Sequence, residues 1–163
     1  DTCINYAGDK GIYVTWEFEP GFAFNKPSYI LKVLDTLQHN NFGLMYDTCH
    51  GQMMGVNGVR QEGEKEVVSD QVELISKFSG SIIHLHLIDS DNTCHKDADG
   101  NDETSAHPPF GDGILDFDQI VPVLAKENVG HDWWTVDLCF WPEAWDATEK
   151  CKTALDSLVS KYG

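Results

Sequence analysis

Hydrophobic and polar positions along the chain form segments that predict strands and helices in turn. Stretches rich in β-branched and aromatic residues predict strands over residues 13–19, 42–47, 81–89 and 133–140. Apolar residues spaced three and four apart predict amphipathic helices over residues 27–37, 67–79, 116–124 and 147–162. The strand cores are dominated by Val, Ile, Leu and Trp, so the alternation predicts an α/β fold with a parallel sheet.

Two stretches lack this periodicity and are expected to be loops. Residues 51–63 are polar and glycine-rich, and residues 90–113 carry Asp, Asn, Gly and Pro throughout. Loops as long as the second one are usually functional or disordered. Asp89 and Asp91 belong to the acidic start of this loop, and we expect both to be solvated.

Composition and charge exclude several classes of partner. The 163 residues include 27 acidic and 11 basic side chains, which gives a formal charge of −16. Nucleic acid and anionic membranes are bound through Lys and Arg, so neither is expected as a partner. The chain has no apolar run long enough to cross a bilayer. With 41% hydrophobic residues, residues 1–163 are expected to form a single domain.

Five cysteines are spread along the chain without a C-x-x-C pair. Their odd number and wide spacing indicate neither a zinc knuckle nor a compact disulfide framework. We interpret them as free thiols in a reducing compartment, which predicts a cytoplasmic protein.

Each predicted strand carries an acidic or imidazole side chain near its end, on its less apolar face. Side chains alternate between the two faces of a strand, which assigns Glu19, Asp47, His86 and Asp137 to this face. Glu17 shares the parity of Glu19 and would replace it if the strand ended earlier. Otherwise Glu17 is expected to partner a buried Lys, His or water.

If the strands belong to a barrel, these ends converge at its carboxyl-terminal mouth. Three converging carboxylates repel one another unless a cation neutralises them. Three oxygen donors and one imidazole suit Mn²⁺, Mg²⁺ or Co²⁺ better than a structural zinc, which prefers thiolates. We therefore expect one divalent metal, with Mn²⁺ preferred and Co²⁺, Mg²⁺ or Zn²⁺ as alternatives.

Four motifs, in this order, resemble the xylose-isomerase-like TIM barrels, which include sugar phosphate isomerases and epimerases and endonuclease IV. They are Glu19-Pro20, D-T-C-H over residues 47–50, H-L-H-L-I-D over residues 84–89 and H-P-P-F-G-D-G over residues 107–113. The resemblance implies a (β/α)8 barrel of which this chain supplies about the last five β/α units, strands four to eight. The missing strands would come from a longer chain, which we favour, or from a second polypeptide, and a homo-oligomer is possible.

The resemblance also implies roles for individual residues. The metal ligands would be Glu19, Asp47, His86 and Asp137, and the family's epimerases use two metal-bound glutamates to move a proton next to a carbonyl. Asp137 is one methylene shorter than the family's glutamate, which preserves metal binding more readily than proton transfer. The catalytic candidates are thus Glu19 and Asp137, together with His50, which would orient the substrate or Asp47.

Substrate contacts are expected from two histidines and three aromatic side chains. His50 and His107 would face the substrate, while Phe22 and Trp141 beside the strand ends would stack on a sugar ring, as would Phe140. The leading hypothesis is a metal-dependent sugar isomerase or epimerase. No glycine-rich phosphate cradle is evident, which favours a non-phosphorylated substrate.

Three alternatives remain open. A lyase or dehydratase acting on a keto-sugar would use the same metal and base. An endonuclease IV-like hydrolase would resemble a multi-zinc enzyme that carries Asp two residues before the loop histidine, where this chain has Ser105. A non-catalytic truncated barrel subunit would retain affinity for metal or sugar without turnover.

Overall fold

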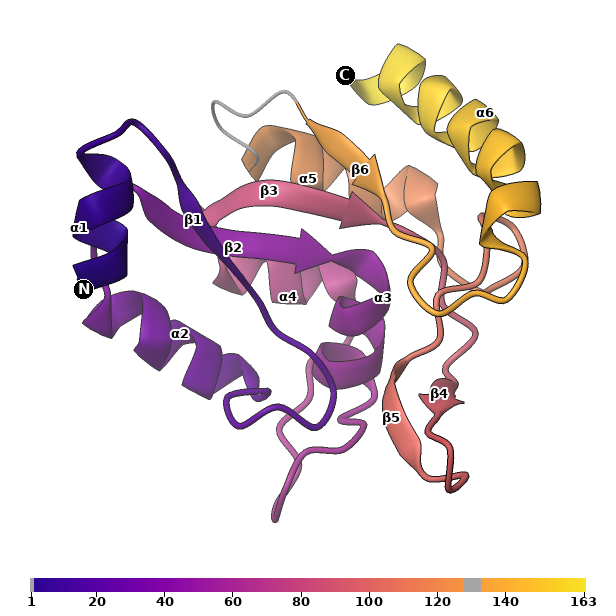
Figure 1. Ribbon diagram of the computed structural model, residues 1–163, viewed down its shortest axis with the longest axis horizontal. Coiled ribbons are helices and arrows are strands. Elements are labelled where there is room, and N and C mark those ends of the chain that lie inside the picture. The colour runs from indigo at the N-terminus through magenta and orange to yellow at the C-terminus, as the bar shows by residue number, and fades with distance from the viewer. Residues whose placement is uncertain (1, 128–132) are drawn as a thin grey trace.

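The fold centres on a parallel sheet, seen in a computed structural model that describes residues 2–127 and 133–163. Its strands run in the order β1-β2-β3-β6 (Figure 1). Their bounds are β1 Val14–Glu17, β2 Phe42–Asp47, β3 Ile82–Leu87 and β6 Trp134–Val136. All four predicted strands are present, and β2 has the predicted bounds, whereas the other three are shorter. The described residues therefore supply four parallel strands, one fewer than the five units expected from the resemblance.

Helices lie between the strands, before β1 and after β6. They are α1 Thr2–Gly8, α2 Pro27–Thr36, α3 Thr48–His50, the π-helix η1 Gly51–Val56, α4 Gln71–Lys77, α5 Phe117–Glu127 and α6 Ala144–Tyr162. Helix α4 begins later than predicted because Asp70 caps it, accepting a 2.8 Å hydrogen bond from the backbone N–H of Glu73. No helix among the described residues has the length and apolarity needed to cross a bilayer.

The glycine-rich stretch after β2 begins with a helical segment, contrary to the loop expected there. In η1, Met53 and Met54 are fully buried, so the segment contributes to the core. Gly55 packs so closely under α4 that a Cβ atom at this position would lie 2.4 Å from Cδ2 of Leu74. Helix packing thus requires a glycine at this position. Composition alone did not distinguish a glycine needed for packing from a glycine in a loop.

The long loop after β3 also contains regular structure, the antiparallel hairpin of β4 Cys94–Lys96 and β5 Asp102–Ser105. Its turn is held by the Asp97 carboxylate, which accepts hydrogen bonds from the backbone N–H groups of Asp99 and Asn101 at 2.9 and 2.8 Å. These contacts are polar and local, so the hairpin left no hydrophobic period in the sequence.

One face of the sheet is covered by helices and forms the core. Leu44, Tyr46, Leu85 and Leu87 are fully buried on this face, as their alternation predicted. Ile83 departs from that alternation. Leu44 pairs with Ile82 and the next residue, Met45, pairs with His84, so Ile83 lies in a bulge of β3.

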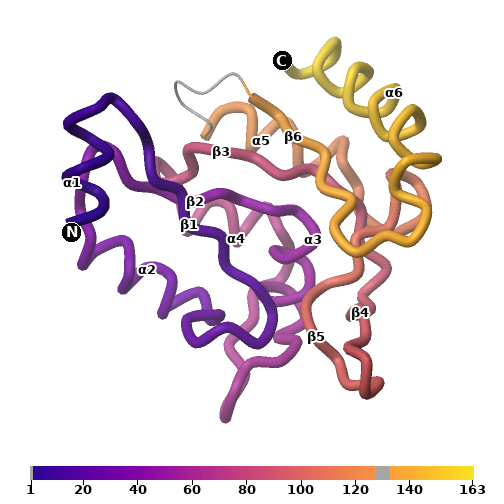
Figure 2. Tube along the Cα trace, in the orientation of Figure 1, coloured from indigo at the N-terminus to yellow at the C-terminus, as the bar shows by residue number. Residues whose placement is uncertain are grey.

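The carboxyl ends of the strands gather at one end of the sheet. In Figure 1 the arrowheads of β2 and β3 point toward α3 and the β4–β5 hairpin, while α4 lies below the sheet and α5 behind it. The tube in Figure 2 shows the segment after β6 running past the same end before it enters α6. Polar residues that end different strands are therefore brought together here.

Candidate metal centre and substrate cavity

Four side chains from the strand ends form one compact group. Glu17 ends β1, Asp47 ends β2, His86 lies in β3 and Asp137 follows β6 directly. Each offers one ligand atom, and these four atoms lie within 4.8 Å of one another. Three of the four are residues that the sequence placed in a metal site.

The fourth member is Glu17, whereas the sequence analysis placed Glu19 there. Strand β1 ends at Glu17, level with Met45 of β2, and the chain then turns, with the backbone N–H of Phe22 bonded to the carbonyl of Glu19. Glu19 instead belongs to a separate group with Glu17 and His50, and accepts a 2.8 Å hydrogen bond from Oγ1 of Thr104. Glu17 and Glu19 share a parity, so the choice depended on where the strand ends.

Several ligand atoms in this group lack hydrogen-bond partners although they are shielded from solvent. These atoms are Oε1 of Glu17, Oδ2 of Asp47 and Nδ1 of His86. Nδ1 of His86 lies 3.2 Å from Oε1 of Glu17 and 3.4 Å from Oδ2 of Asp137, at poor hydrogen-bond geometry. A buried polar atom without a partner costs roughly 1–3 kcal/mol. A divalent cation among these atoms would satisfy all of them, so the residues present fit a metal.

The protonation states of the group are strongly coupled. Burial raises the pKa of Asp47 well above its ordinary value. Burial also opposes charge on His86, yet its contacts with the carboxylates of Asp137 and Glu17 raise the pKa of His86 to about 10. Burial acts against ionised Asp137 too, but His86 holds its pKa below the ordinary value. A proton on His86 thus offsets part of the negative charge that a metal would neutralise.

Two predicted histidines lie beside this group, and both are buried. Nδ1 of His50 is 2.9 Å from Oγ of Ser105, and the backbone N–H of His50 donates to Oδ1 of Asp47 at 2.7 Å. The imidazole of His107 packs 4.8 Å from that of His50, with Nδ1 3.5 Å from Oδ2 of Asp137. Burial lowers the pKa of both histidines, so both are neutral near pH 7.

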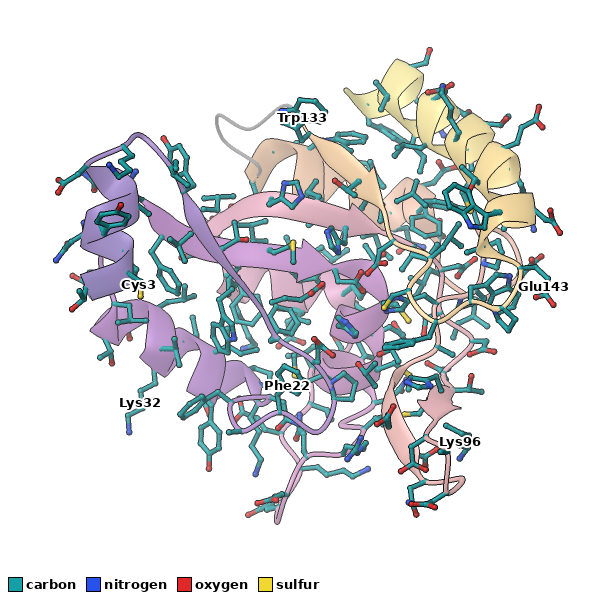
Figure 3. All side chains as sticks on the ribbon, viewed as in Figure 1. Cys3, Phe22, Lys32, Lys96, Trp133 and Glu143 are labelled. Carbon is teal, nitrogen blue, oxygen red and sulfur yellow. The ribbon has the colours of Figure 1, made fainter. Side chains whose placement is uncertain are left out.

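A cavity of about 530 Å³ opens over the site. Its described lining includes Phe22, which Figure 3 labels on the loop after β1, but Trp141 is not among the lining residues. Phe140, the third aromatic candidate, does line the cavity, and it stacks on His95 with ring centroids 4.1 Å apart.

The hairpin supplies lining residues that the sequence analysis did not identify. They are His95, Asp97, Asn101, Asp102, Glu103 and Thr104, joined by Arg60 from the segment after η1. The Arg60 guanidinium donates to the carbonyl of Glu103, and Nε2 of His95 lies 2.7 Å from Oε2 of Glu103. No apolar pattern marked this segment, although its length had indicated a functional loop.

The expectation that Asp89 is solvated is wrong, because its carboxylate is buried. It accepts hydrogen bonds from the backbone N–H groups of Ser90, before the hairpin, and of Gly111 and Leu115, in the loop after it. Asp91, in contrast, is exposed as expected.

The chain belongs to the xylose isomerase-like TIM barrel family, whose model matches residues 1–159. Its fold is therefore the α/β TIM-barrel fold, here with the parallel strands described above. No curated protein matches the chain.

Solved structures share this fold at low sequence identity. A xylose isomerase-like TIM barrel protein from Mycobacterium smegmatis in complex with magnesium is 15% identical, with a TM-score of 0.67 over 99% of this chain and 49% of that one. A probable 3-DHS dehydratase from Bacillus anthracis is 17% identical, with a TM-score of 0.64 over 95% and 53%. A D-allulose 3-epimerase from Methylomonas sp. is 17% identical, with a TM-score of 0.65 over 95% and 51%. The chain thus spans about half the length of the structures it matches.

Proposed function

We propose that this chain carries the metal centre of a divalent-metal-dependent sugar isomerase or epimerase. The observation that carries the proposal is the group of Glu17, Asp47, His86 and Asp137. Three of them hold a buried polar atom without a partner, and two of the four, Glu17 and Asp137, line the cavity. Solved structures of the same fold include a D-allulose 3-epimerase and an L-ribulose 3-epimerase, which supports this class of reaction.

Glu17, Asp47, His86 and Asp137 would hold the ion. Three carboxylates and one imidazole favour Mn²⁺, with Mg²⁺, Co²⁺ or Zn²⁺ as alternatives. When bound, such an ion polarises substrate oxygens and stabilises negative charge that develops on them. Asp47 is suited to an anchoring role because Oδ1 is already fixed by the backbone N–H of His50, while Oδ2 has no other partner.

Two carboxylates that line the cavity are our candidates for proton exchange with a bound sugar. Glu19 and Asp137 both line the cavity, and Glu19 lies outside the four-residue group. Oδ2 of Asp137 is held near His86 and His107, at 3.4 and 3.5 Å, which limits its reach. We assign Glu19 and Asp137 to proton transfer at the carbon next to the carbonyl, and His50 and His107 to orienting the substrate.

The cavity favours a neutral polyhydroxylated substrate. Its lining carries six carboxylates, those of Glu17, Glu19, Asp97, Asp102, Glu103 and Asp137. Arg60 is the sole Lys or Arg among the described lining residues, so a phosphate would meet strong repulsion. Hydroxyl groups can donate to these carboxylates, and the half-exposed ring of Phe22 offers an apolar surface for the carbons of a sugar.

A dehydratase acting on a keto-sugar is the second candidate. Elimination of water begins with the same proton abstraction and then needs a proton donor for the departing hydroxyl, which Glu19 could provide. The probable 3-DHS dehydratase among the matching structures supports dehydration as the second candidate reaction.

An endonuclease IV-like reaction is not favoured. Ser105 occupies the position where that resemblance requires an aspartate, and its buried hydroxyl is engaged with Nδ1 of His50. The charge of −16 also opposes DNA binding.

The reaction can be tested by hydrogen exchange from the substrate. The protein is incubated with Mn²⁺ and each of a panel of ketoses in D2O, and the products are followed by ¹H NMR and mass spectrometry. We expect deuterium at a carbon next to the carbonyl together with the epimeric or isomeric sugar, and neither in Asp137→Asn. Loss of water from the sugar would identify the dehydratase. Stoichiometric metal without exchange on any ketose would contradict an enzyme and favour a non-catalytic subunit.

A further inference from the structure

The carboxylate of Asp89 is surrounded by backbone N–H groups. Asp89 follows β3, three residues beyond His86, and only 2% of its surface is exposed. Oδ1 accepts from the N–H groups of Ser90 and Leu115 at 2.8 and 3.0 Å, and Oδ2 from those of Gly111 and Gly113 at 2.9 and 3.2 Å. One side chain therefore ties the end of β3 to the loop over residues 111–115.

Gly113 shows how closely this loop wraps around the carboxylate. A Cβ atom at this position would lie 2.3 Å from Oδ1 of Asp89 and 2.4 Å from the carbonyl oxygen of Ser90. Glycine is thus the residue that permits the contact. Charge-assisted hydrogen bonds of this kind are stronger than neutral ones, so the loop has little freedom to move away.

A stiff, buried segment connects this loop to the site. Pro108, Pro109 and Phe110 lie between Gly111 and His107, and all three are buried. The ring of Phe110 packs against that of Phe117 with centroids 4.7 Å apart. Two consecutive prolines fix two φ angles, so a displacement of Gly111 is transmitted to His107 rather than absorbed.

His107 depends on this segment because no hydrogen bond fixes its ring. Only 1% of its surface is exposed, yet neither Nδ1 nor Nε2 has a hydrogen-bond partner. Histidines at functional sites are usually oriented by a hydrogen bond from the second ring nitrogen. The direction of this imidazole toward Asp47 and Asp137 is therefore set by its backbone and by packing.

We propose that Asp89 is a positioning residue that sets the orientation of His107 in the site through the Pro108-Pro109 segment. The inference deepens the proposed function, because it rests on His107 facing the substrate. Among the described residues, Asp89 neither lines the cavity nor belongs to the four-residue group.

The test compares two matched Asp→Asn substitutions in the full chain. Asp89→Asn replaces one acceptor oxygen by an NH2 group and so removes two of the four hydrogen bonds. Asp91→Asn makes the same change two residues away, at an exposed side chain whose acceptor bonds, within the described part of the chain, come from Thr93. The readout is the ¹H–¹³C correlation signal of the His107 ring, identified by its absence in His107→Gln.

We expect the His107 signal to shift or broaden in Asp89→Asn and to stay unchanged in Asp91→Asn. The signal of His39, which is exposed and remote from the cavity, should be the same in all variants. A purely structural role would lower the melting temperature without singling out the ring of His107. A folded Asp89→Asn protein with an unchanged His107 signal would overturn the proposal.

A second variant covers the case in which Asp89→Asn does not fold. Pro108→Ala leaves every hydrogen bond to Asp89 in place but frees the φ angle at residue 108, so the segment that leads to His107 becomes more flexible. The proposal requires the His107 signal to broaden here as well, and an unchanged signal would contradict it. This readout needs neither metal nor sugar. Failure of the proposed enzyme activity would therefore leave the result on Asp89 intact, and the reverse also holds.

Discussion

Asp47 shows how one side chain serves both the fold and the site. Its Oδ1 caps α3 by accepting from the backbone N–H of His50, which fixes the carboxylate at the end of β2. Its Oδ2 is buried without a partner and faces the other three candidate ligands. The cap thus orients the second oxygen, so the geometry of the centre is established before any ion binds.

The two glutamates after β1 should differ sharply in their effect on metal affinity. We predict that Glu17→Gln weakens Mn²⁺ binding at least ~10-fold, the lower range for loss even of an outer-shell partner. Glu19→Gln, the matched substitution outside the four-residue group, should change affinity by less than about threefold while it abolishes proton exchange on the sugar. Isothermal titration with Mn²⁺ measures the first effect. Equal losses in both variants would contradict the assignment of Glu17.

The sequence predicted three of the four side chains that the structure brings together, but not how far along β1 the fourth one lies. Alternation of side chains was sufficient for Asp47, His86 and Asp137, because each of them lies on the less apolar face near the end of its strand. It could not separate Glu17 from Glu19, which share a face. That choice depended on where the pairing of β1 with β2 ends, which is at Glu17, before the turn that Pro20 marks in the sequence.

At the scale of elements, the β4–β5 hairpin closes one side of the cavity. Thr104 of β5 reaches Glu19, Glu103 of β5 bonds Arg60, and His95 of β4 stacks on Phe140 after β6. The hairpin is thereby joined to segments after β1, η1 and β6. We expect it to determine which sugar fits rather than how the metal is held.

Removal of the hydrogen bond between Thr104 and Glu19 tests whether the hairpin affects sugar binding and not metal binding. Thr104→Val keeps the shape of the side chain but loses a bond worth about 0.5–1.5 kcal/mol. We predict weaker sugar binding, by roughly 2- to 10-fold on that scale, with Mn²⁺ affinity unchanged. Thr153→Val on the exposed face of α6 is the control, because its hydroxyl donates to the backbone carbonyl of Glu149 in the same helix. A loss of metal rather than sugar affinity in Thr104→Val would argue against the prediction.

The attachment of α6 to α5 should depend on pH. Hydrogen bonds from Lys161 and Tyr162 hold the pKa of Asp118 below its ordinary value of 3.8. A lowered pKa in the folded state gives a contribution that is present above the ordinary value and is lost as the pH falls through the lowered one.

Amide hydrogen exchange at the carboxyl end of α6 measures this contribution. We predict that wild type is better protected than Asp118→Asn at neutral pH and that the difference disappears at strongly acidic pH. The effect should be small because all three side chains are exposed. A difference that persists in acid would contradict the assignment.

Elements with a clear hydrophobic period were predictable, and those held by polar or close contacts were not. Strand β2 was predicted with its observed bounds, since its largely apolar run ends at Asp47. The hairpin is held by the turn at Asp97, and η1 by the approach of Gly55 to Leu74. Neither type of contact produces a period of two or of 3.6 residues.

For the whole molecule, an ion held by these four residues would link metal binding to folding. The four candidate ligands come from four strands, so the centre exists only when the sheet is assembled. An ion that binds only the folded chain stabilises it by about 2.7 kcal/mol at a free concentration 100-fold above the Kd.

We therefore predict that Mn²⁺ raises the melting temperature of the chain in a concentration-dependent way. Asp47→Asn should lose this increase, because it removes charge at the most deeply buried ligand. Asp91→Asn, an exposed carboxylate outside the group, should retain it. Differential scanning calorimetry with increasing Mn²⁺ measures the shift. An equal increase in both variants would indicate non-specific binding to the acidic surface.

Anomalous X-ray scattering from crystals grown with Mn²⁺ tests the central claim most directly. The account predicts one strong anomalous peak per chain within bonding distance of Glu17, Asp47, His86 and Asp137. A crystal without a peak at this position, or with one bound only by other side chains, would contradict it.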